Sequence, residues 1–277
     1  MNSEGLHLHI NYLGSSGVIL NPEQAATLQS SLVILQHDHK FHRVFFWGKI
    51  MGIKGDYFIV QGCGNDEMVD RKTLYSSDCL TWGLLPHATT AMREQCSVVK
   101  GRFIGDPSHE YEHIEIKRIG EGDDATEEEN TIMIKEEDRL ASVVVNIDED
   151  VAMVPRGAYF KTPHGTVQMN RMFEGLSVVE SGKLQNYFHF REPQKLKEKS
   201  LLEKADMDPS IDFLDPISED IPQGRSYTIQ FERGSGLLII RSLLWLGMMF
   251  YHVPSSKQFG YVYFGTGEKN KDLPFML

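Results

Sequence analysis

The sequence predicts an α+β fold, a mainly antiparallel sheet with two or three packed helices. Short segments rich in aromatic and β-branched residues recur along the chain, and turn residues separate them. Two longer segments instead carry apolar residues at the 3.6-residue spacing of a helix. With 277 residues, the chain is also long enough to bury a large core without disulfide or metal staples.

The N-terminal segment, residues 1–40, is expected to be helical and to precede one domain over residues 41–277. Asn21 is a favourable N-cap, Pro22 suits the first helical position, and Gln24 stands where a capping box has Glu or Gln. The helix that begins here carries one apolar stripe, which consists of Ala25, Leu28, Leu32 and Leu35.

A series of strands follows this helix. Residues 44–50 are aromatic and β-branched and too few for a typical helix, so we predict a strand that forms a hairpin with residues 57–60. Residues 121–129 hold six acidic side chains and no basic one, and their mutual repulsion predicts a solvated, mobile loop. Further strands are expected at residues 72–75, 97–104 and 113–119.

The second half of the chain opens with another long helix and then returns to strands. Five apolar residues share one helical face: Leu140, Val143, Val144, Ile147 and Val151. Shorter helices are expected at residues 177–187, which begin like a capping box, and at residues 196–205. The apolar tail, residues 273–277, is expected to be docked rather than left in water. The remaining strands are predicted at residues 227–232, 237–240, 243–245, 248–253 and 259–264.

Charge and hydropathy exclude several classes of function. The chain has 28 basic and 39 acidic residues and no sustained basic run, so the footprint of a nucleic-acid-binding protein is missing. Partners should be neutral or basic. The most apolar stretch, residues 237–251, is too short to span a bilayer and is interrupted by Arg241, and no secretory signal is visible. We therefore expect a soluble protein that binds neither nucleic acid nor membrane.

The sequence offers little that resembles a catalytic or metal site. Residues 109–113 match the H-E-x-x-H form of zinc proteases, but the neighbouring pattern predicts a strand, in which residues four apart are separated by roughly 13 Å. Cys63, Cys79 and Cys96 form no Cys-x-x-Cys pair and are expected to be reduced, buried thiols. We predict no catalytic residues, no metal site and no cofactor.

The aromatic residues of the C-terminal strands and tail are the candidate partner-binding residues. Trp and Tyr dominate interface energetics, although each such residue taken singly is more often part of the protein's own core. Strands that are apolar on both faces indicate that at least one face meets another subunit. The candidates are Trp245, Phe250, Tyr251, Tyr261, Tyr263, Phe264 and Phe275.

Eight ordered phrases run through nearly the whole chain beyond the first twenty residues. They are FFWGKI at residues 45–50, DYFIV at 56–60, KTLY at 72–75, GRFIGDP at 101–107, VPRGA at 154–158, YFHFREP at 187–193, GTGEKN at 265–270 and DLPFML at 272–277. In these phrases the chain resembles the radial spoke head protein 9 family of motile cilia.

The resemblance implies a structural subunit of the radial spoke head, without enzymatic role or cofactor. It implies binding to other head subunits, especially the related 4/6-type, and contact with the central microtubule pair through the assembled head. The implied role is in spoke head assembly and regulation of axonemal motility, and the implied location is the cytoplasm and cytoskeleton, in the axoneme of cilia and flagella. Whether the chain also forms a homodimer is left open. So are two alternatives from other classes, a small cytosolic hydrolase and a general cytosolic adaptor.

Overall fold

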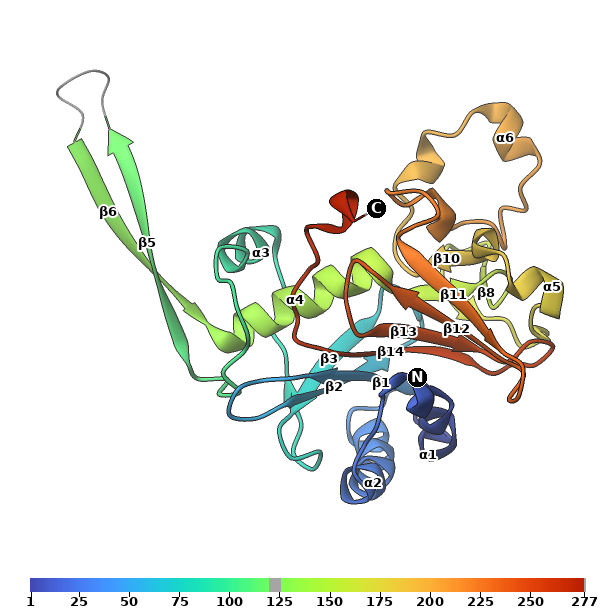
Figure 1. Ribbon diagram of the computed structural model, residues 1–277, viewed down its shortest axis with the longest axis horizontal. Coiled ribbons are helices and arrows are strands. Elements are labelled where there is room, and N and C mark those ends of the chain that lie inside the picture. The colour runs from blue at the N-terminus through green and yellow to red at the C-terminus, as the bar shows by residue number, and fades with distance from the viewer. Residues whose placement is uncertain (120–125, 277) are drawn as a thin grey trace.

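The computed structural model, which describes residues 1–119 and 126–276, is built around one eight-stranded sheet (Figure 1). Its strand order is β11-β12-β13-β14-β1-β2-β3-β4, and every neighbouring pair is antiparallel except β1 and β14. The predicted fold class is therefore confirmed. The strands are β1 (Arg43–Ile50), β2 (Tyr57–Cys63), β3 (Arg71–Ser76), β4 (Gly83–Leu84), β11 (Tyr227–Glu232), β12 (Leu237–Ser242), β13 (Met248–His252) and β14 (Phe259–Gly265).

Alternation along the strands sends apolar side chains into two cores, one on each face of the sheet. Leu237 and Ile239 of β12 face one core, whereas Leu238 and Ile240 face the other. In β1 a register irregularity between Phe46 and Gly48 breaks this alternation, so that Trp47 and Ile50, three residues apart, face the same core. Runs of apolar residues without polar interruption therefore mark strands that are covered on both faces.

Helices of the same chain cover both faces of the sheet (Figure 1). The N-terminal helices α1 (Leu6–His9) and α2 (Pro22–Asp38) pack on one face, and α2 begins with the predicted capping box. Helix α4 (Glu136–Val151) packs on the other face. Whether residues 1–40 form a unit separate from residues 41–277 stays a prediction.

A third, smaller core lies beside the sheet, under two short two-stranded sheets. It contains Phe173, Phe188 and Phe213 among other aromatic and apolar side chains. The elements of this region are β7 (Met153–Pro155), β8 (Tyr159–Lys161), β9 (Val167–Met169), α5 (Val178–Ser181), β10 (Tyr187–His189) and α6 (Leu201–Ala205). The predicted helices at residues 177–187 and 196–205 are thus present but shorter.

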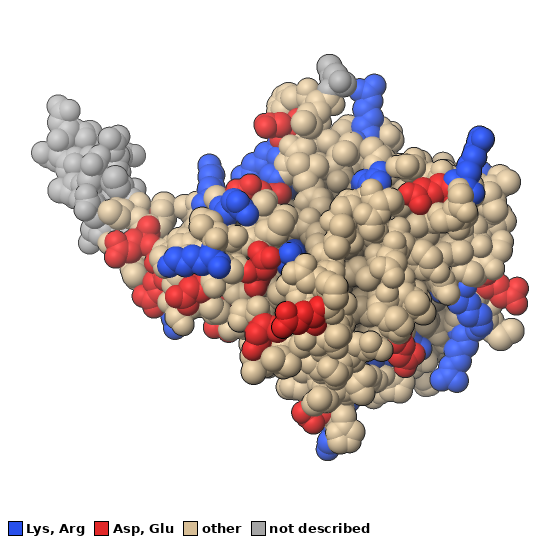
Figure 2. Space-filling view, turned by 60° about the horizontal axis from the view of Figure 1, so that its bottom comes forward, with Lys and Arg blue, Asp and Glu red and all other residues tan. Residues whose placement is uncertain are grey.

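One hairpin stands apart from the rest of the fold. Strands β5 (Glu110–Ile119) and β6 (Thr126–Lys135) pair with each other and project away from the body (Figure 1). We call this hairpin the arm. Figure 2 shows acidic side chains gathered next to the grey segment, on the side where the arm leaves the body. The predicted strand at residues 113–119 is confirmed as part of β5.

Two predicted strands, at residues 97–104 and 243–245, are wrong. Residues 97–104 follow α3 (Thr90–Cys96), a helix that the sequence analysis missed and that Thr89 caps by accepting from the backbone N–H of Met92. Residues 243–245 bend out of the strand, because the Ser242 hydroxyl accepts from the backbone N–H groups of Leu244 and Trp245.

Two further expectations are corrected in part. Of the predicted loop 121–129, residues 126–129 belong to strand β6, since ladder pairing with β5 outweighs their charge repulsion, and residues 121–125 lie outside the described residues. In the tail, Leu273 is buried, but Phe275 is 82% exposed and Met276 60% exposed. Of the tail residues that the structure describes, 273–276, only Leu273 is therefore docked. Among the residues described, no helix is long and apolar enough to cross a membrane.

Candidate partner-binding groove

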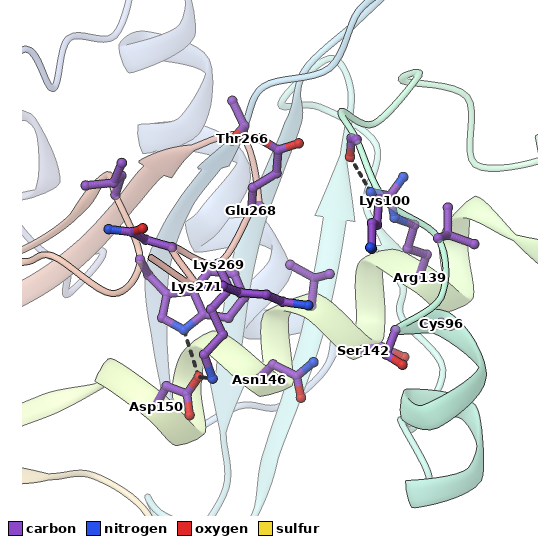
Figure 3. Close-up of a pocket in the computed structure, with 18 of the residues that line it drawn as sticks. Cys96, Lys100, Arg139, Ser142, Asn146, Asp150, Thr266, Glu268, Lys269 and Lys271 are labelled. Carbon is purple, nitrogen blue, oxygen red and sulfur yellow. Dashed lines mark hydrogen bonds and ion pairs between the residues drawn. The ribbon is translucent and has the colours of Figure 1, made fainter. Parts of the chain in front are cut away.

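An open groove of about 740 Å³ lies between α4, the segment that follows α3, and the C-terminal residues 266–276 (Figure 3). We call it the α4 groove. Arg139, Asn146 and Asp150 of α4 line its length, and Lys269 and Lys271 line the opposite side.

Asp150, at the C-terminal end of α4, fixes the floor of the groove. Its Oδ2 accepts from the indole Nε1 of Trp245 at 2.8 Å and from Nζ of Lys269 at 2.7 Å. The Lys269 ammonium also lies 5.9 Å from the centre of the Trp245 ring. A carboxylate, an indole and an ammonium group thus hold the C-terminal segment onto the helix.

Arg93 fixes the wall that α3 forms. Its guanidinium donates two hydrogen bonds to the Glu149 carboxylate, at 2.8 and 2.5 Å, and a third to Asn146 Oδ1 at 2.8 Å. A bidentate pair of this kind orients both partners as well as holding them. The wall therefore keeps a fixed position relative to α4.

Glu136, the first residue of α4, holds the other end of the groove. Its fully buried carboxylate accepts from the hydroxyls of Tyr57 and Tyr111 and from the backbone N–H groups of residues 104, 105 and 106. Burial opposes ionisation, yet these hydrogen bonds prevail and keep the pKa of the Glu136 carboxyl below its ordinary value. Arg139 stacks over the rings of Phe103 and Tyr111 and donates to the Gly101 carbonyl.

The GTGEKN phrase forms a packed wall and not a phosphate-binding loop. The backbone N–H of Gly267, which would have to face a phosphate, donates to the Tyr263 hydroxyl at 2.9 Å. Gly267 has φ +77°, and a Cβ there would lie 2.7 Å from Phe103. Asn270 closes the turn by hydrogen bonds to the carbonyls of Leu243 and Leu244.

The rim of the groove combines uncompensated basic groups with exposed apolar ones. Lys100 and Lys271 are exposed and have no ion-pair partner among the described residues. Leu246 is 59% exposed and Met276 60% exposed on the same rim. Five basic and three acidic residues line the groove, so in a chain of net charge −11 it is a locally basic and apolar surface. It suits a segment that carries acidic and apolar side chains.

The seven predicted partner-binding aromatics lie at very different depths. Trp245, Phe250, Tyr251 and Tyr263 are at most 3% exposed and fill the two cores, while Tyr261 and Phe264 are half-buried. Phe275 is largely exposed. The apolar strand faces that suggested a partner are covered by α2 and α4, so that argument for an interface fails. Partner contact by the seven residues stays a prediction.

Lys100 and Lys271 were not predicted as site residues, because an isolated lysine in a sequence gives no signal of where it lies in the fold. Three of the eight phrases nevertheless contribute residues to the groove. Gly101 from the phrase at 101–107, residues 266–270, and Asp272 and Met276 from the last phrase line its walls and rim. Trp245, which the analysis did name, forms its floor.

The alternative of a hydrolase finds no assembled catalytic set in the described part of the chain. His113 lies within strand β5, so the H-E-x-x-H residues lack the helical spacing that a zinc site needs. The most enzyme-like pair is His189 with Asp220, at 2.9 Å. The second ring nitrogen of His189, Nδ1, would have to face a nucleophile. It is buried and has no hydroxyl or thiol within hydrogen-bond distance among the described residues. The three cysteines are free and buried, as predicted.

Comparison with known proteins defines the class first. A family model described as radial spokehead-like protein matches residues 2–172, more than half of the chain, which is therefore a radial spokehead-like protein. Within that class, the chain belongs to the radial spoke head protein 9 family. It is 55% identical to the radial spoke head protein 9 homologs of Bos taurus and Homo sapiens and 54% identical to that of Danio rerio, over the full length of each chain. This family belongs to the ciliary axoneme, as the resemblance implied.

Proposed function

We propose that this protein is a non-catalytic structural subunit of the radial spoke head. It is held there by contacts with other head subunits, and it contributes to assembly of the head and thereby to regulation of axonemal motility. Family membership supports a location in the radial spoke head. The absence of an assembled catalytic set among the described residues supports a role in binding. Its contribution is a shaped surface.

The observation that carries the proposal is the convergence of family phrases on the α4 groove. The phrases at residues 101–107, 265–270 and 272–277 are far apart in the chain and meet at one place on the surface. Packing explains Phe103 and Leu273, which are buried. It does not explain Phe275 and Met276, whose apolar side chains are left largely in water.

The proposed occupant of the groove is an acidic and apolar segment of a 4/6-type head subunit. Lys100 and Lys271 would pair with its carboxylates, and the exposed side chains of Leu246 and Met276 would meet its apolar residues. Contact with the central pair would then occur through the assembled head. The chain's net charge of −11 disfavours direct binding to another strongly acidic surface.

Reversing the groove's charge is expected to weaken retention in the head. The double variant Lys100→Glu, Lys271→Glu would repel an acidic segment, and we expect recovery of head subunits in a pull-down from ciliary extract to fall by about tenfold or more. Neither lysine has a partner in the described part of the chain, so the folded protein should keep its thermal midpoint.

The matched control is Lys54→Glu, Lys72→Glu, which makes the same charge change at two exposed lysines outside the groove. This control should recover head subunits like the wild type. If the wild-type protein itself recovers no head subunit, the proposed function is wrong. If both double variants lose recovery equally, the groove is not the contact site.

A further inference from the structure

The arm has a shape that packing within the chain does not require. Strands β5 and β6 pair over ten residue pairs, from Glu110 with Lys135 to Ile119 with Thr126. Apart from its base, the arm extends away from the body (Figure 1). Ile114 is 55% exposed and Met133 49% exposed, on the same face of the hairpin. A long hairpin with exposed apolar groups and no covering layer is marginally stable alone.

The base of the arm is nevertheless rigidly fixed. Tyr111 in β5 donates through its hydroxyl to the buried Glu136 carboxylate and accepts from Arg139 at 3.2 Å. The backbone N–H of Glu136 donates to the His109 carbonyl at 2.8 Å, so the arm is tied to the start of α4 on both strands. The direction in which the arm leaves the body is therefore set by buried contacts. Such an arm is presented to something outside the chain.

Both strands of the arm are edge strands. The arm is a separate two-stranded sheet, and no third strand of the described chain pairs with β5 or β6. Each strand accordingly presents a row of backbone N–H and C=O groups along its outer side. Proteins usually shorten or cover such an edge, because it is a template for pairing with another chain. Here each strand runs for ten residues.

The charge of the arm selects among possible partners. The two strands carry six glutamates and three basic residues. Each basic residue stands opposite a glutamate in the register: Lys135 opposite Glu110, Lys117 opposite Glu128, and Arg118 opposite Glu127. Six glutamates against three basic residues make the arm acidic overall. Edge pairing between two copies of the arm would bring like charges together, which disfavours a second copy as the occupant.

We propose that the arm binds a partner by β-augmentation: it adds its edge to an open strand of a spoke head component, and lysine or arginine side chains flank that strand. Main-chain hydrogen bonds supply affinity in this mode, and the glutamates supply selection for a basic strand. This inference rests on the proposed role as a head subunit. It concerns a different surface from the α4 groove.

Amide hydrogen exchange tests the proposal in the native assembly. We compare exchange at residues 110–115 and 131–135 in the purified protein and in intact spoke heads that contain it. Pairing along one edge should slow exchange by about tenfold or more at alternate residues of one strand, where the outward N–H groups lie. Unchanged exchange throughout the arm in the intact head would overturn the proposal.

A charge variant tests the chemistry of the partner. The variant Glu110→Lys, Glu112→Lys is expected to lose the slowed exchange and to enter spoke heads at least about tenfold less well than the wild type. The matched control is Glu23→Lys, Glu94→Lys, two exposed glutamates on helices α2 and α3. If the arm variant keeps wild-type protection, the partner strand is not basic and the proposal is wrong.

Other occupants give different outcomes. If exchange in the arm slows when the purified protein alone is concentrated, a second copy occupies the edge and the proposal is overturned. If the chain is absent from spoke heads altogether, the proposed function is wrong, and the proposal about the arm, which rests on it, is wrong as well. If the chain is present in spoke heads but amide exchange in its arm is not slowed, only the proposal about the arm is refuted.

Discussion

Replacing Gly48 by alanine is expected to prevent the two halves of the main sheet from joining. Gly48 lies in β1 with φ +145°, and its backbone meets that of Tyr263 in β14. A Cβ added there would lie 2.0 Å from the Tyr263 carbonyl oxygen and 2.7 Å from its backbone nitrogen. Both are main-chain atoms that cannot swing away, so the strands themselves must separate.

The consequence is large because of where this contact lies. The parallel pairing of β1 with β14 joins the N-terminal strands β1–β4 to the C-terminal strands β11–β14. We expect the Gly48→Ala variant to lose more than about 4 kcal/mol of unfolding free energy, a large share of what a domain has. Urea denaturation followed by tryptophan fluorescence measures the loss.

Gly234→Ala is the control for this substitution. Gly234 has no atom within 4 Å of an added Cβ, so alanine there should change the unfolding free energy by less than about 0.5 kcal/mol. A Gly48→Ala protein that unfolds within about 1 kcal/mol of the wild type would show that the junction of β1 and β14 is not as close as described.

Glu136→Ala is expected to have the second largest effect. The substitution leaves two tyrosine hydroxyls and three backbone N–H groups without their acceptor. Each buried donor without a partner costs about 1–3 kcal/mol, and after water enters we expect a net loss of about 3–5 kcal/mol. Proteolysis in the arm should also become faster, because Tyr111 loses its anchor. Urea denaturation and limited proteolysis measure the two effects.

Glu110→Ala provides the comparison, since Glu110 is an exposed glutamate on the same hairpin. Its replacement should leave the unfolding free energy within about 0.5 kcal/mol of the wild type. Equal losses in the two variants would contradict the role assigned to the buried carboxylate.

The pH dependence of the unfolding free energy provides a second test of Glu136. Because the folded-state pKa of Glu136 lies below its unfolded value of about 4.5, its contribution is complete above that pH and is lost as pH falls through the folded-state pKa. The variant Glu136→Gln has no proton to take up at this position. Its unfolding free energy should therefore fall less steeply than that of the wild type between pH 5 and pH 3. Parallel slopes would contradict the lowered pKa.

Helix α4 connects the features that these variants probe. Its first residue, Glu136, fixes the base of the arm, and Asp150 near its end holds Trp245 and Lys269 in the floor of the groove. Between these ends, Leu140, Val144 and Ile147 pack in the core under the sheet. The helix thus gives the two proposed contact surfaces a fixed relative position.

Sequence reasoning succeeded where local signals agreed with packing. Helix α2 was predicted from Asn21, Pro22 and Gln24, and the capping box forms. It failed where a side chain or a cap overrode propensity. Val98 and Val99 favour a strand, but their backbone N–H groups donate to the carbonyls of Gln95 and Cys96 in the turn that ends α3. Leu243 to Trp245 resemble a strand in composition, but the Ser242 hydroxyl turns the chain there.

The candidate site was predicted less well than the fold. Large aromatics are common both in interfaces and in cores, and the sequence could not show that α2 and α4 cover both faces of the sheet. Trp245 illustrates the result, because it was chosen as a contact residue and forms the buried floor of the groove. Lys100 and Lys271 come together only through folding, so no spacing in the sequence could have indicated them.

Lysine labelling of intact radial spokes tests the central claim most directly, namely that the α4 groove is a contact surface of a spoke head subunit. Both Lys100 and Lys271 are exposed in the isolated chain, as is Lys54 outside the groove. We predict that Lys100 and Lys271 become at least about tenfold less reactive in the assembled spoke head, whereas Lys54 keeps its reactivity. Equal reactivity of the groove lysines in the free protein and in the spoke head would contradict the account.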